Sequence, residues 1–194
     1  MNRRLVMFAW KFLSCLLLLI GVMEYYILQE QYKKELQKVR HATILLVSKQ
    51  EMSLRLIDYK GKEIFFAPMA CGKSFGNKLA KGDMKTPEGI FQVQDIQNAS
   101  DWKHDFKDGK GDVENAYGPY FIRLYTPGHK GIGIHGTHDS LSIGTRATEG
   151  CIRLNNEDLI KLVSLICPPL TVVITPSAED EAKNALQNKP KDKS

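Results

Sequence analysis

The chain has 194 residues, 43% of them hydrophobic and 25% charged, with a formal net charge of +5. This composition is typical of a globular protein and excludes an intrinsically disordered chain. The positive excess is small and no basic run is interleaved with aromatic residues, which argues against a protein that binds nucleic acid. The first forty or so residues look non-globular, and the rest leaves about 130 residues for a globular domain, which is enough to bury one core.

An apolar stretch near the N-terminus predicts contact with a membrane. Residues 5–23 are apolar except for Lys11 and one serine, and as a helix they reach roughly 28 Å, about the thickness of a bilayer core. Lys11 lies near the start of the stretch and can extend toward the same side as Arg3 and Arg4. The positive-inside rule makes that side cytoplasmic. We therefore expect a signal anchor over residues 1–23, with the rest of the chain outside the cytoplasm.

A cleaved signal peptide is the alternative, because Phe12–Met23 alone has the length of its apolar region. However, Gly21 is followed by bulky and charged residues with no small-x-small cleavage site, so we favour an uncleaved anchor. Cys15 lies near the front of the apolar run rather than after its end, so we interpret it as a residue of the span and not as a lipidation site.

Residues 24–41 are predicted to form a helical stalk. Glu30 and Lys34 are spaced to pair at i,i+4, and apolar residues recur at three- and four-residue steps on another face: Tyr25, Leu28, Tyr32, Leu36 and Val39. This stripe spans fewer than three heptads, so a spacer or a strip packed on the domain is favoured over a dimer contact.

Strand patterns dominate from residue 43 onward and predict a mainly β domain over residues 42–176. The expected strands are 43–48, 52–57, 63–70, 89–95, 121–125, 131–135 and 170–175. One amphipathic helix follows at about 156–166, capped by Asn155 or Asn156, with Leu159 and Leu162 on its apolar face. Residues 177–194 are polar and charged, and we expect a mobile tail there.

Residues 97–116 are too polar and glycine-rich for a core element, and they predict a flap. Trp102 and Phe106 are candidates for stacking on a substrate, although anchoring of the loop is the more common role of such aromatics. His104 and Asp105 invite a metal interpretation that we consider weak. Cys71 and Cys167 either form a disulfide in an oxidising compartment or are two separate core cysteines.

A histidine and a cysteine carry the chemistry of this chain. A thiol with an ordinary pKa near 8.5 is mostly protonated at neutral pH, and an imidazole that takes its proton activates it. Cys151 is thus the candidate nucleophile and His135 its base. Gly150 leaves room for backbone amides near a reacting carbonyl, and Arg153 lies on the same side of an extended segment as Cys151. The alternative is a small buried cysteine and a structural histidine.

The wider pattern resembles the L,D-transpeptidases, also called the YkuD or ErfK family. The resemblance covers about residues 43–175 and rests on Ile134-His135-Gly136-Thr137 and on Thr148-Glu149-Gly150-Cys151-Ile152-Arg153, with further similarity in the segments 82–91, 117–120 and 131–134. It implies a β-sandwich or barrel with one main helix after the nucleophile. The chain departs from the pattern at Glu149, where many members carry histidine, and an anion there would raise the pKa of Cys151.

The resemblance implies acyl transfer on peptidoglycan stem peptides in bacterial cell-wall biogenesis, without a cofactor. Cys151 would attack the carbonyl after the L-centre of a diamino acid, expel terminal D-alanine and form a thioester, and His135 would move the protons while the backbone carbonyl of Gly136 orients it. Arg153 would contact the donor carboxylate or support the cysteine loop, and Thr148 would orient that loop. The acceptor would be an amine of a second stem, a lysine of an outer-membrane lipoprotein, or water.

Three alternatives remain open. A zinc site built from His135, His138 and Cys151 needs a helical or tightly turned spacing, which Gly136 opposes, and no fourth ligand is evident. A carboxypeptidase that only trims stem peptides shares every motif named above. A membrane-tethered, non-catalytic wall-binding module with a vestigial Cys–His pair is the third, motivated by Glu149.

Overall fold

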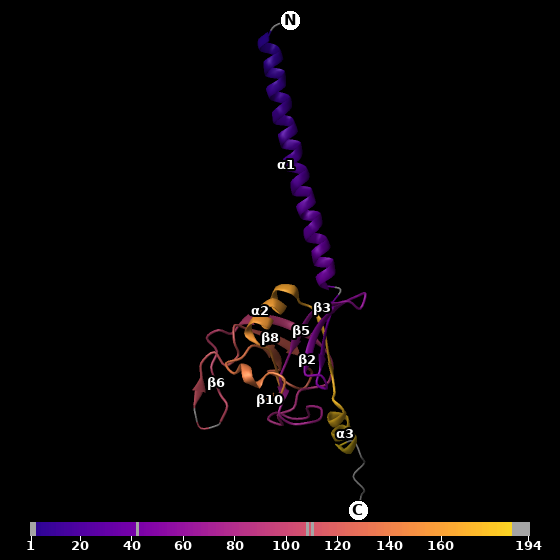
Figure 1. Ribbon diagram of the computed structural model, residues 1–194, viewed down its shortest axis with the longest axis vertical. Coiled ribbons are helices and arrows are strands. Elements are labelled where there is room, and N and C mark those ends of the chain that lie inside the picture. The colour runs from indigo at the N-terminus through magenta and orange to yellow at the C-terminus, as the bar shows by residue number, and fades with distance from the viewer. Residues whose placement is uncertain (1–2, 42, 108, 110, 188–194) are drawn as a thin grey trace, which may run out of the picture. The chain divides into compact units, whose positions relative to one another are not determined.

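The computed structural model describes residues 3–41, 43–107, 109 and 111–187. It divides into two compact units, Met1–Val39 and Arg40–Ser194. The described part of the first unit is helical and belongs to α1, Arg3–His41, whose last residues fall in the second unit. Figure 1 shows α1 in indigo and the strands and remaining helices of the second unit in later colours.

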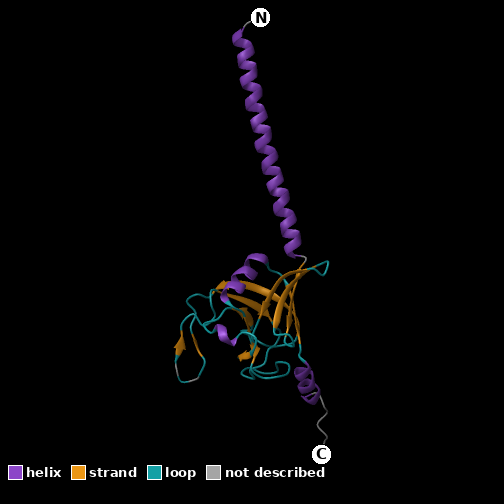
Figure 2. Ribbon diagram, in the orientation of Figure 1, coloured by secondary structure: helices purple, strands orange, loops and turns teal. Residues whose placement is uncertain are grey.

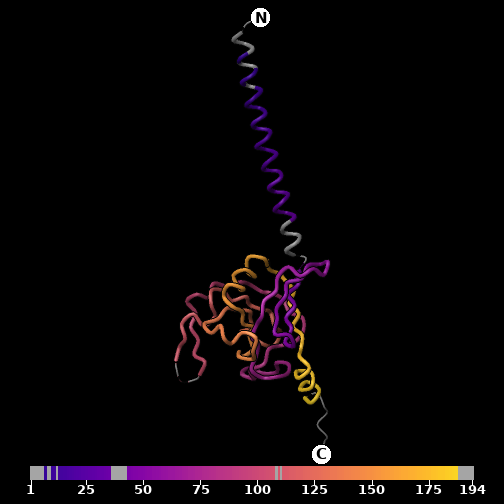
Figure 3. Tube along the Cα trace, viewed as in Figure 1, coloured from indigo at the N-terminus to yellow at the C-terminus, as the bar shows by residue number. Residues whose placement is uncertain are grey.

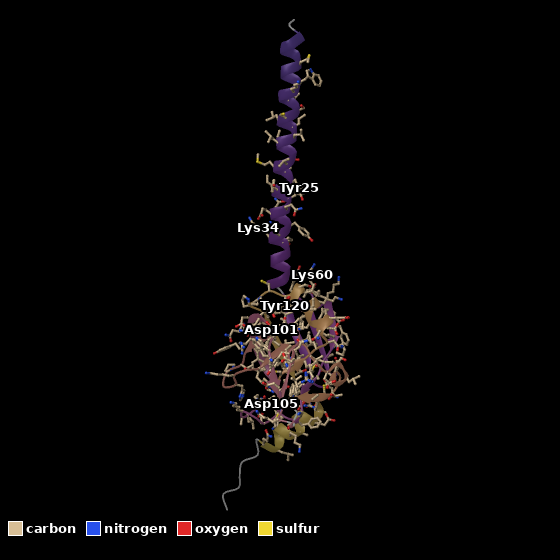
Figure 4. All side chains as sticks on the ribbon, turned by 90° about the vertical axis from the view of Figure 1, so that its left-hand side faces the viewer. Tyr25, Lys34, Lys60, Asp101, Asp105 and Tyr120 are labelled. Carbon is tan, nitrogen blue, oxygen red and sulfur yellow. The ribbon has the colours of Figure 1, made fainter. Side chains whose placement is uncertain are left out.

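Helix α1 contains one stretch, Leu13–Glu35, that is long and apolar enough to cross a membrane. It overlaps the predicted span 5–23 from Leu13 onward, and a signal sequence near the N-terminus would meet the same criterion. Tyr25 and Lys34 both project from this helix (Figure 4). The predicted i,i+4 pair is wrong, because Glu30 pairs with Lys33 at 3.2 Å, one residue earlier. The side chains of Leu36 and Val39 lie outside the described residues.

In the described residues of the second unit, eight strands form one curled sheet (Figure 2), which confirms the predicted mainly β fold. The strands are β1 Thr43–Ser48, β2 Ser53–Asp58, β3 Glu63–Pro68, β5 Gly89–Asn98, β8 Tyr120–Tyr125, β9 Gly133–His135, β11 Ile152–Arg153 and β12 Thr171–Thr175. Their order across the sheet is β11-β9-β8-β5-β12-β1-β2-β3.

Alternating apolar residues place one face of this sheet in the core. Along β1, Leu45 and Val47 are buried, and they pair with Val172 and Ile174 of the parallel strand β12. Helix α2, Asn156–Leu165, buries Leu159 and Leu162 against the same core. Its N-cap is Asn155, as predicted, but the Asn155 side chain makes no capping hydrogen bond.

Short elements that no periodic pattern revealed complete the unit. Strand β4, Cys71–Gly72, pairs with β10, Arg146–Thr148, and a 3₁₀ turn, η1, spans Ser140–Ser142. Strand β6, His104–Asp105, pairs with β7, Asp112–Val113. The β6–β7 hairpin extends from the sheet (Figure 1), and it forms the tip of the segment that was predicted to be a flap.

The polar C-terminal segment corrects the expectation of a mobile tail from residue 177. Helix α3 spans Ala178–Gln187, and its Asp180 is fully buried and paired with Lys49 at 3.1 Å and with Arg146 at 2.6 Å. A buried carboxylate with two cationic partners holds the helix to the sheet. Figure 3 shows α3 in yellow beside the magenta loop 73–88. Residues 188–194 lie outside the described residues.

Candidate active site

Two parallel strands at one end of the sheet, β9 and the edge strand β11, bring the predicted histidine and cysteine together. Strand β11 pairs with β9 in the register Ile152↔Ile134 and Arg153↔His135. His135 ends β9, and Cys151 immediately precedes β11, so the two residues come from strands that lie about 4.8 Å apart in the sheet. Both side chains line one cavity of about 710 Å³. The fold therefore assembles the pair that the sequence indicated.

His135 is held in one orientation by its surroundings. Its Nδ1 lies 2.7 Å from the carbonyl oxygen of Gly136, so the tautomer with a proton on Nδ1 donates there and leaves Nε2 as an acceptor. The ring stacks on Phe121 and meets the edge of Tyr117. His135 is only 4% exposed, and burial lowers its pKa to about 3. The imidazole is consequently neutral at neutral pH.

Asn156 fixes the backbone next to His135. Its amide accepts from the N–H of Thr137 at 2.8 Å and donates to the carbonyl of Thr137 at 3.0 Å. A Cβ at Gly136 would overlap the Asn156 side chain, so this position requires glycine. The sequence suggested Asn156 only as a possible helix cap, and this supporting role was missed because no local pattern distinguishes the two.

Cys151 is a neutral thiol in this structure. Burial raises its pKa to about 11, although the positive charges of Lys78 and Arg153 act in the opposite direction and Glu149 adds to the rise. Its Sγ lies 3.4 Å from the carbonyl oxygen of Gly131. A neutral thiol and a neutral imidazole that line one cavity can form a thiolate when the proton moves to the base as a carbonyl is attacked.

Gly150 and Thr148 shape the turn before Cys151. Gly150 has φ +137°, and a Cβ there would lie 2.7 Å from the carbonyl oxygen of Lys85. Thr148 Oγ1 donates to the carbonyl of Cys151 at 2.6 Å and accepts from the Gly150 N–H at 3.2 Å. These are the contacts expected of a residue that orients the cysteine loop.

Arg153 is a buried cation beside the cysteine. It is 4% exposed and lines the cavity, and its Nη1 donates to Ser142 Oγ at 2.9 Å. Its Nε is buried without a hydrogen-bond partner, and no carboxylate of the described residues forms an ion pair with it. Burial lowers the pKa of Arg153, but an arginine stays charged at neutral pH. An unpaired buried guanidinium at a cavity wall is suited to a ligand carboxylate.

The other side chains that line the cavity include lysines, aromatic residues and one carboxylate. Lys78, Lys81 and Lys130 line the cavity, and Lys78 is buried and paired with Asp83 at 2.8 Å. His104, Phe106, Tyr117 and Glu149 also line it. Sequence reasoning missed Lys78, because a lysine in a polar loop looks like an ordinary surface residue.

The two aromatic candidates of the flap, Trp102 and Phe106, have different surroundings. Trp102 packs on Tyr117 and Phe121, with ring centroids 5.8 and 5.5 Å apart, and has the anchoring role. Phe106 lines the cavity and packs on His104. Asp105, labelled in Figure 4, pairs with Lys107 at 2.7 Å on the exposed hairpin.

Within the described residues, no three or more His, Cys, Asp and Glu side chains are gathered as a metal site. Cys71 and Cys167 are free thiols.

A cysteine and an oriented, neutral histidine in one cavity at the edge of a curled sheet are the arrangement of a thiol-dependent enzyme. The family model of the L,D-transpeptidase catalytic domain, YkuD, matches residues 42–174. This chain belongs to that family.

Relatives and solved structures agree with this assignment. The chain is 38% identical over 132 residues to YkuD of Bacillus licheniformis, assigned as an L,D-transpeptidase, covering 68% of this chain and 65% of that protein. It is 32% identical over 112 residues to YqjB of Bacillus subtilis, with the same assignment, covering 56% of this chain and 62% of that one. The chain thus spans less than two thirds of the length of these relatives.

Among solved structures, the helical cell shape determining protein Pgp2 from Campylobacter jejuni is similar, with a TM-score of 0.53 and 25% identity, over 72% of this chain and 49% of that chain. An L,D-transpeptidase from Mycobacterium tuberculosis shares the fold with a TM-score of 0.52 and 16% identity, over 69% of this chain and 57% of the other.

Proposed function

We propose that this protein is a membrane-anchored cysteine acyltransferase that acts on peptidoglycan stem peptides. It cleaves the bond before terminal D-alanine through a thioester on Cys151 and transfers the acyl group to an amine, which forms a crosslink. The observation that carries the proposal is the hydrogen bond between His135 Nδ1 and the Gly136 carbonyl. It leaves Nε2 available to take the thiol proton within the cavity that both side chains line.

The reaction has two steps. His135 takes the proton of Cys151 as the sulfur attacks the carbonyl that follows the L-centre of the diamino acid, and returns it to the amine of departing D-alanine. The positive charges of Lys78 and Arg153 favour the thiolate as it forms. The second amine then attacks the thioester, and the C–S bond breaks.

Arg153 is the donor-binding residue in this proposal. Donor stems carry carboxylates close to the bond that is cleaved, and the guanidinium of Arg153, a residue of the cavity wall, has a buried Nε without a hydrogen-bond partner. A carboxylate placed there would gain a charge-assisted hydrogen bond and neutralise a buried cation. Thr148 and Gly150 hold the loop so that the Cys151 amide can polarise the reacting carbonyl.

The stretch of α1 that is long and apolar enough to cross a membrane supports the proposed location. We propose that it is an uncleaved anchor whose N-terminal arginines remain in the cytoplasm, so that the catalytic unit works outside the cytoplasm, where the wall polymer lies. The acceptor amine then belongs to a second stem or to a lysine of an outer-membrane lipoprotein.

The test uses the full chain in detergent micelles, incubated with disaccharide-tetrapeptide fragments under reducing conditions and followed by mass spectrometry. The proposal expects loss of alanine, a thioester adduct on the protein, and linked dimers. Cys151→Ala should abolish all three, whereas the control Cys167→Ala, which removes a partly buried thiol outside the cavity, should leave them unchanged. Tripeptides without dimers would instead indicate a carboxypeptidase, and no product at all would indicate a non-catalytic wall-binding module.

A further inference from the structure

The cavity around Cys151 carries opposite charges on different residues. Four cations line it: Lys78, Lys81, Lys130 and Arg153. Among its described lining residues, Glu149 is the one carboxylate. Any substrate group with a positive charge is repelled by the first set and attracted only by Glu149.

Glu149 is available to a ligand. Its side chain is 39% exposed, and its ion-pair contact among the described residues is long, with Oε2 3.4 Å from His104 Nε2. The other nitrogen of His104, Nδ1, lies 3.0 Å from the hydroxyl of Tyr117. When that hydroxyl donates to Nδ1, His104 carries its proton on Nε2 and donates toward Glu149. Among the described residues the carboxylate thus has one long ion-pair contact, with His104, and it lies in the cavity wall with part of its surface exposed.

Glu149 works against the nucleophile in the resting enzyme. Its negative charge raises the pKa of Cys151, in opposition to Lys78 and Arg153. An anion placed next to a thiol that must ionise is unfavourable for the first step. A second step that consumes a positively charged reactant gives this carboxylate a use.

We propose that Glu149 is the acceptor subsite, which binds the ammonium group of the acceptor and takes its proton so that the free amine can attack the thioester. This inference rests on the proposed function, because it assigns a residue to the second step of that reaction. It also separates the two substrates: donor carboxylates face the cations of the cavity, and the acceptor ammonium faces Glu149.

Two protons leave the acceptor nitrogen in this step. The acceptor R–NH₃⁺ gives one proton to the Glu149 carboxylate, and the resulting amine forms a C–N bond with the thioester carbonyl. The second N–H proton passes through His135 to the departing sulfur as the C–S bond breaks, which regenerates the Cys151 thiol. Glu149 then releases its proton to solvent through its exposed side. The products are an amide, the free thiol and one proton.

The experiment compares two nucleophiles on the full chain in detergent micelles loaded with a tetrapeptide donor. Nα-acetyl-lysine amide is an ammonium at neutral pH, whereas hydroxylamine is largely uncharged. Glu149→Gln removes the charge with little change of shape. Glu114→Gln is the matched control, because Glu114 is an exposed flap carboxylate that pairs with Lys103 and does not line the cavity.

We expect Glu149→Gln to form the thioester at least as fast as the unaltered chain. Its transfer to the lysine derivative, relative to hydrolysis, should fall by about tenfold or more, the effect of one lost charge-assisted hydrogen bond. Transfer to hydroxylamine should change by less than about threefold. Glu114→Gln should behave as the unaltered chain does.

Two results would overturn the inference while leaving the proposed function intact: unchanged transfer to the lysine derivative in Glu149→Gln, or an equal loss with both nucleophiles. Slower thioester formation with an unchanged partition between transfer and hydrolysis would assign Glu149 to the first step and overturn it as well. If the unaltered chain forms no thioester at all, the proposed function fails, and the inference fails with it.

Discussion

Replacing Asp180 tests whether helix α3 is an integral part of the catalytic unit. Asp180 is fully buried, and each of its oxygens is surrounded by donors. Oδ1 accepts from the Gly76 N–H at 2.6 Å and lies 3.1 Å from Lys49 Nζ. Oδ2 accepts from the N–H and hydroxyl of Ser177 and from Arg146 Nη2. Asp180→Asn keeps the shape but sets an amide N–H against these donors.

The expected loss of folding stability in Asp180→Asn follows from the burial of Asp180 and its cationic partners. Removing one partner of a buried ion pair costs about 3–5 kcal/mol. The lower figure applies here, because Lys49 keeps Glu88 at 2.5 Å. For a domain of about 150 residues, roughly 3 kcal/mol corresponds to a melting temperature lowered by about 6–12 °C. Glu179→Gln, on the exposed neighbour in α3, should change the melting temperature by less than about 2 °C.

The stability that Asp180 contributes should depend on pH in a definite direction. Burial acts to raise the pKa of Asp180, but hydrogen bonds from Ser177 and Gly76 and the charge of Lys49 outweigh it, so the pKa is well below its ordinary value. A carboxylate with a lowered pKa contributes stability above its unfolded value of about 3.9 and loses it as the pH falls toward the folded value. The difference between the unaltered chain and Asp180→Asn should therefore shrink below about pH 4.

The assay is thermal unfolding of the full chain in detergent micelles, followed by near-UV circular dichroism. A melting temperature for Asp180→Asn within about 2 °C of the unaltered chain at neutral pH would refute the reasoning, because the buried donors would then find other partners at no cost. Donor turnover should also fall in this variant, since α3 bonds to Gly76 and Asn77, directly before Lys78 in the cavity wall.

Three further predictions concern the cavity. Gly150→Ala should reduce thioester formation, measured by mass spectrometry, by about 100-fold or more, because the added Cβ would meet the carbonyl oxygen of Lys85. The control Gly144→Ala should not reduce it, because Gly144 also has a positive φ but a Cβ there would lie in open space. With a thiol pKa of about 11, alkylation of Cys151 by iodoacetamide should rise about tenfold per pH unit from pH 7 to 10; a plateau between pH 5 and 8 would indicate a preformed thiolate instead. Arg153→Lys should raise KM for the donor by about tenfold with little change in melting temperature, and the reverse result would mean that Arg153 only supports the loop.

The main strands were predictable because their residues alternate between a buried and an exposed face. The pattern at 43–48 matches β1, whereas only Gly133–His135 of the predicted strand 131–135 belongs to β9. Gly131 has φ +81° and lies in the turn before that strand. Strands of two residues, such as β4 and β11, are too short to show a period. Their pairing is set by the sheet, which local patterns do not encode.

The Cys–His pair was predictable from chemistry and motif, since residues of these two types within a family pattern have few other uses. Lys78, Asn156 and Asp180 were not, because each acts through contacts distant in sequence. The Gly76–Asp180 hydrogen bond joins residues 104 positions apart. Polar residues in a loop or tail are normally solvated, and only the folded chain shows that a lysine or an aspartate meets an opposite charge.

Two residues that the sequence did not predict, Asp180 and Lys78, belong to one structural feature. Asp180 and Asn184 of α3 bind Gly76 and Asn77, and the same loop continues to Lys78, whose ammonium favours the Cys151 thiolate. The segment that was expected to be a mobile tail therefore fixes one end of the loop that carries Lys78 to the cavity of Cys151. It follows that a chain shortened before residue 177 loses more than stability: it loses the buried carboxylate that keeps Lys49 and Arg146 neutralised and the cavity wall in place.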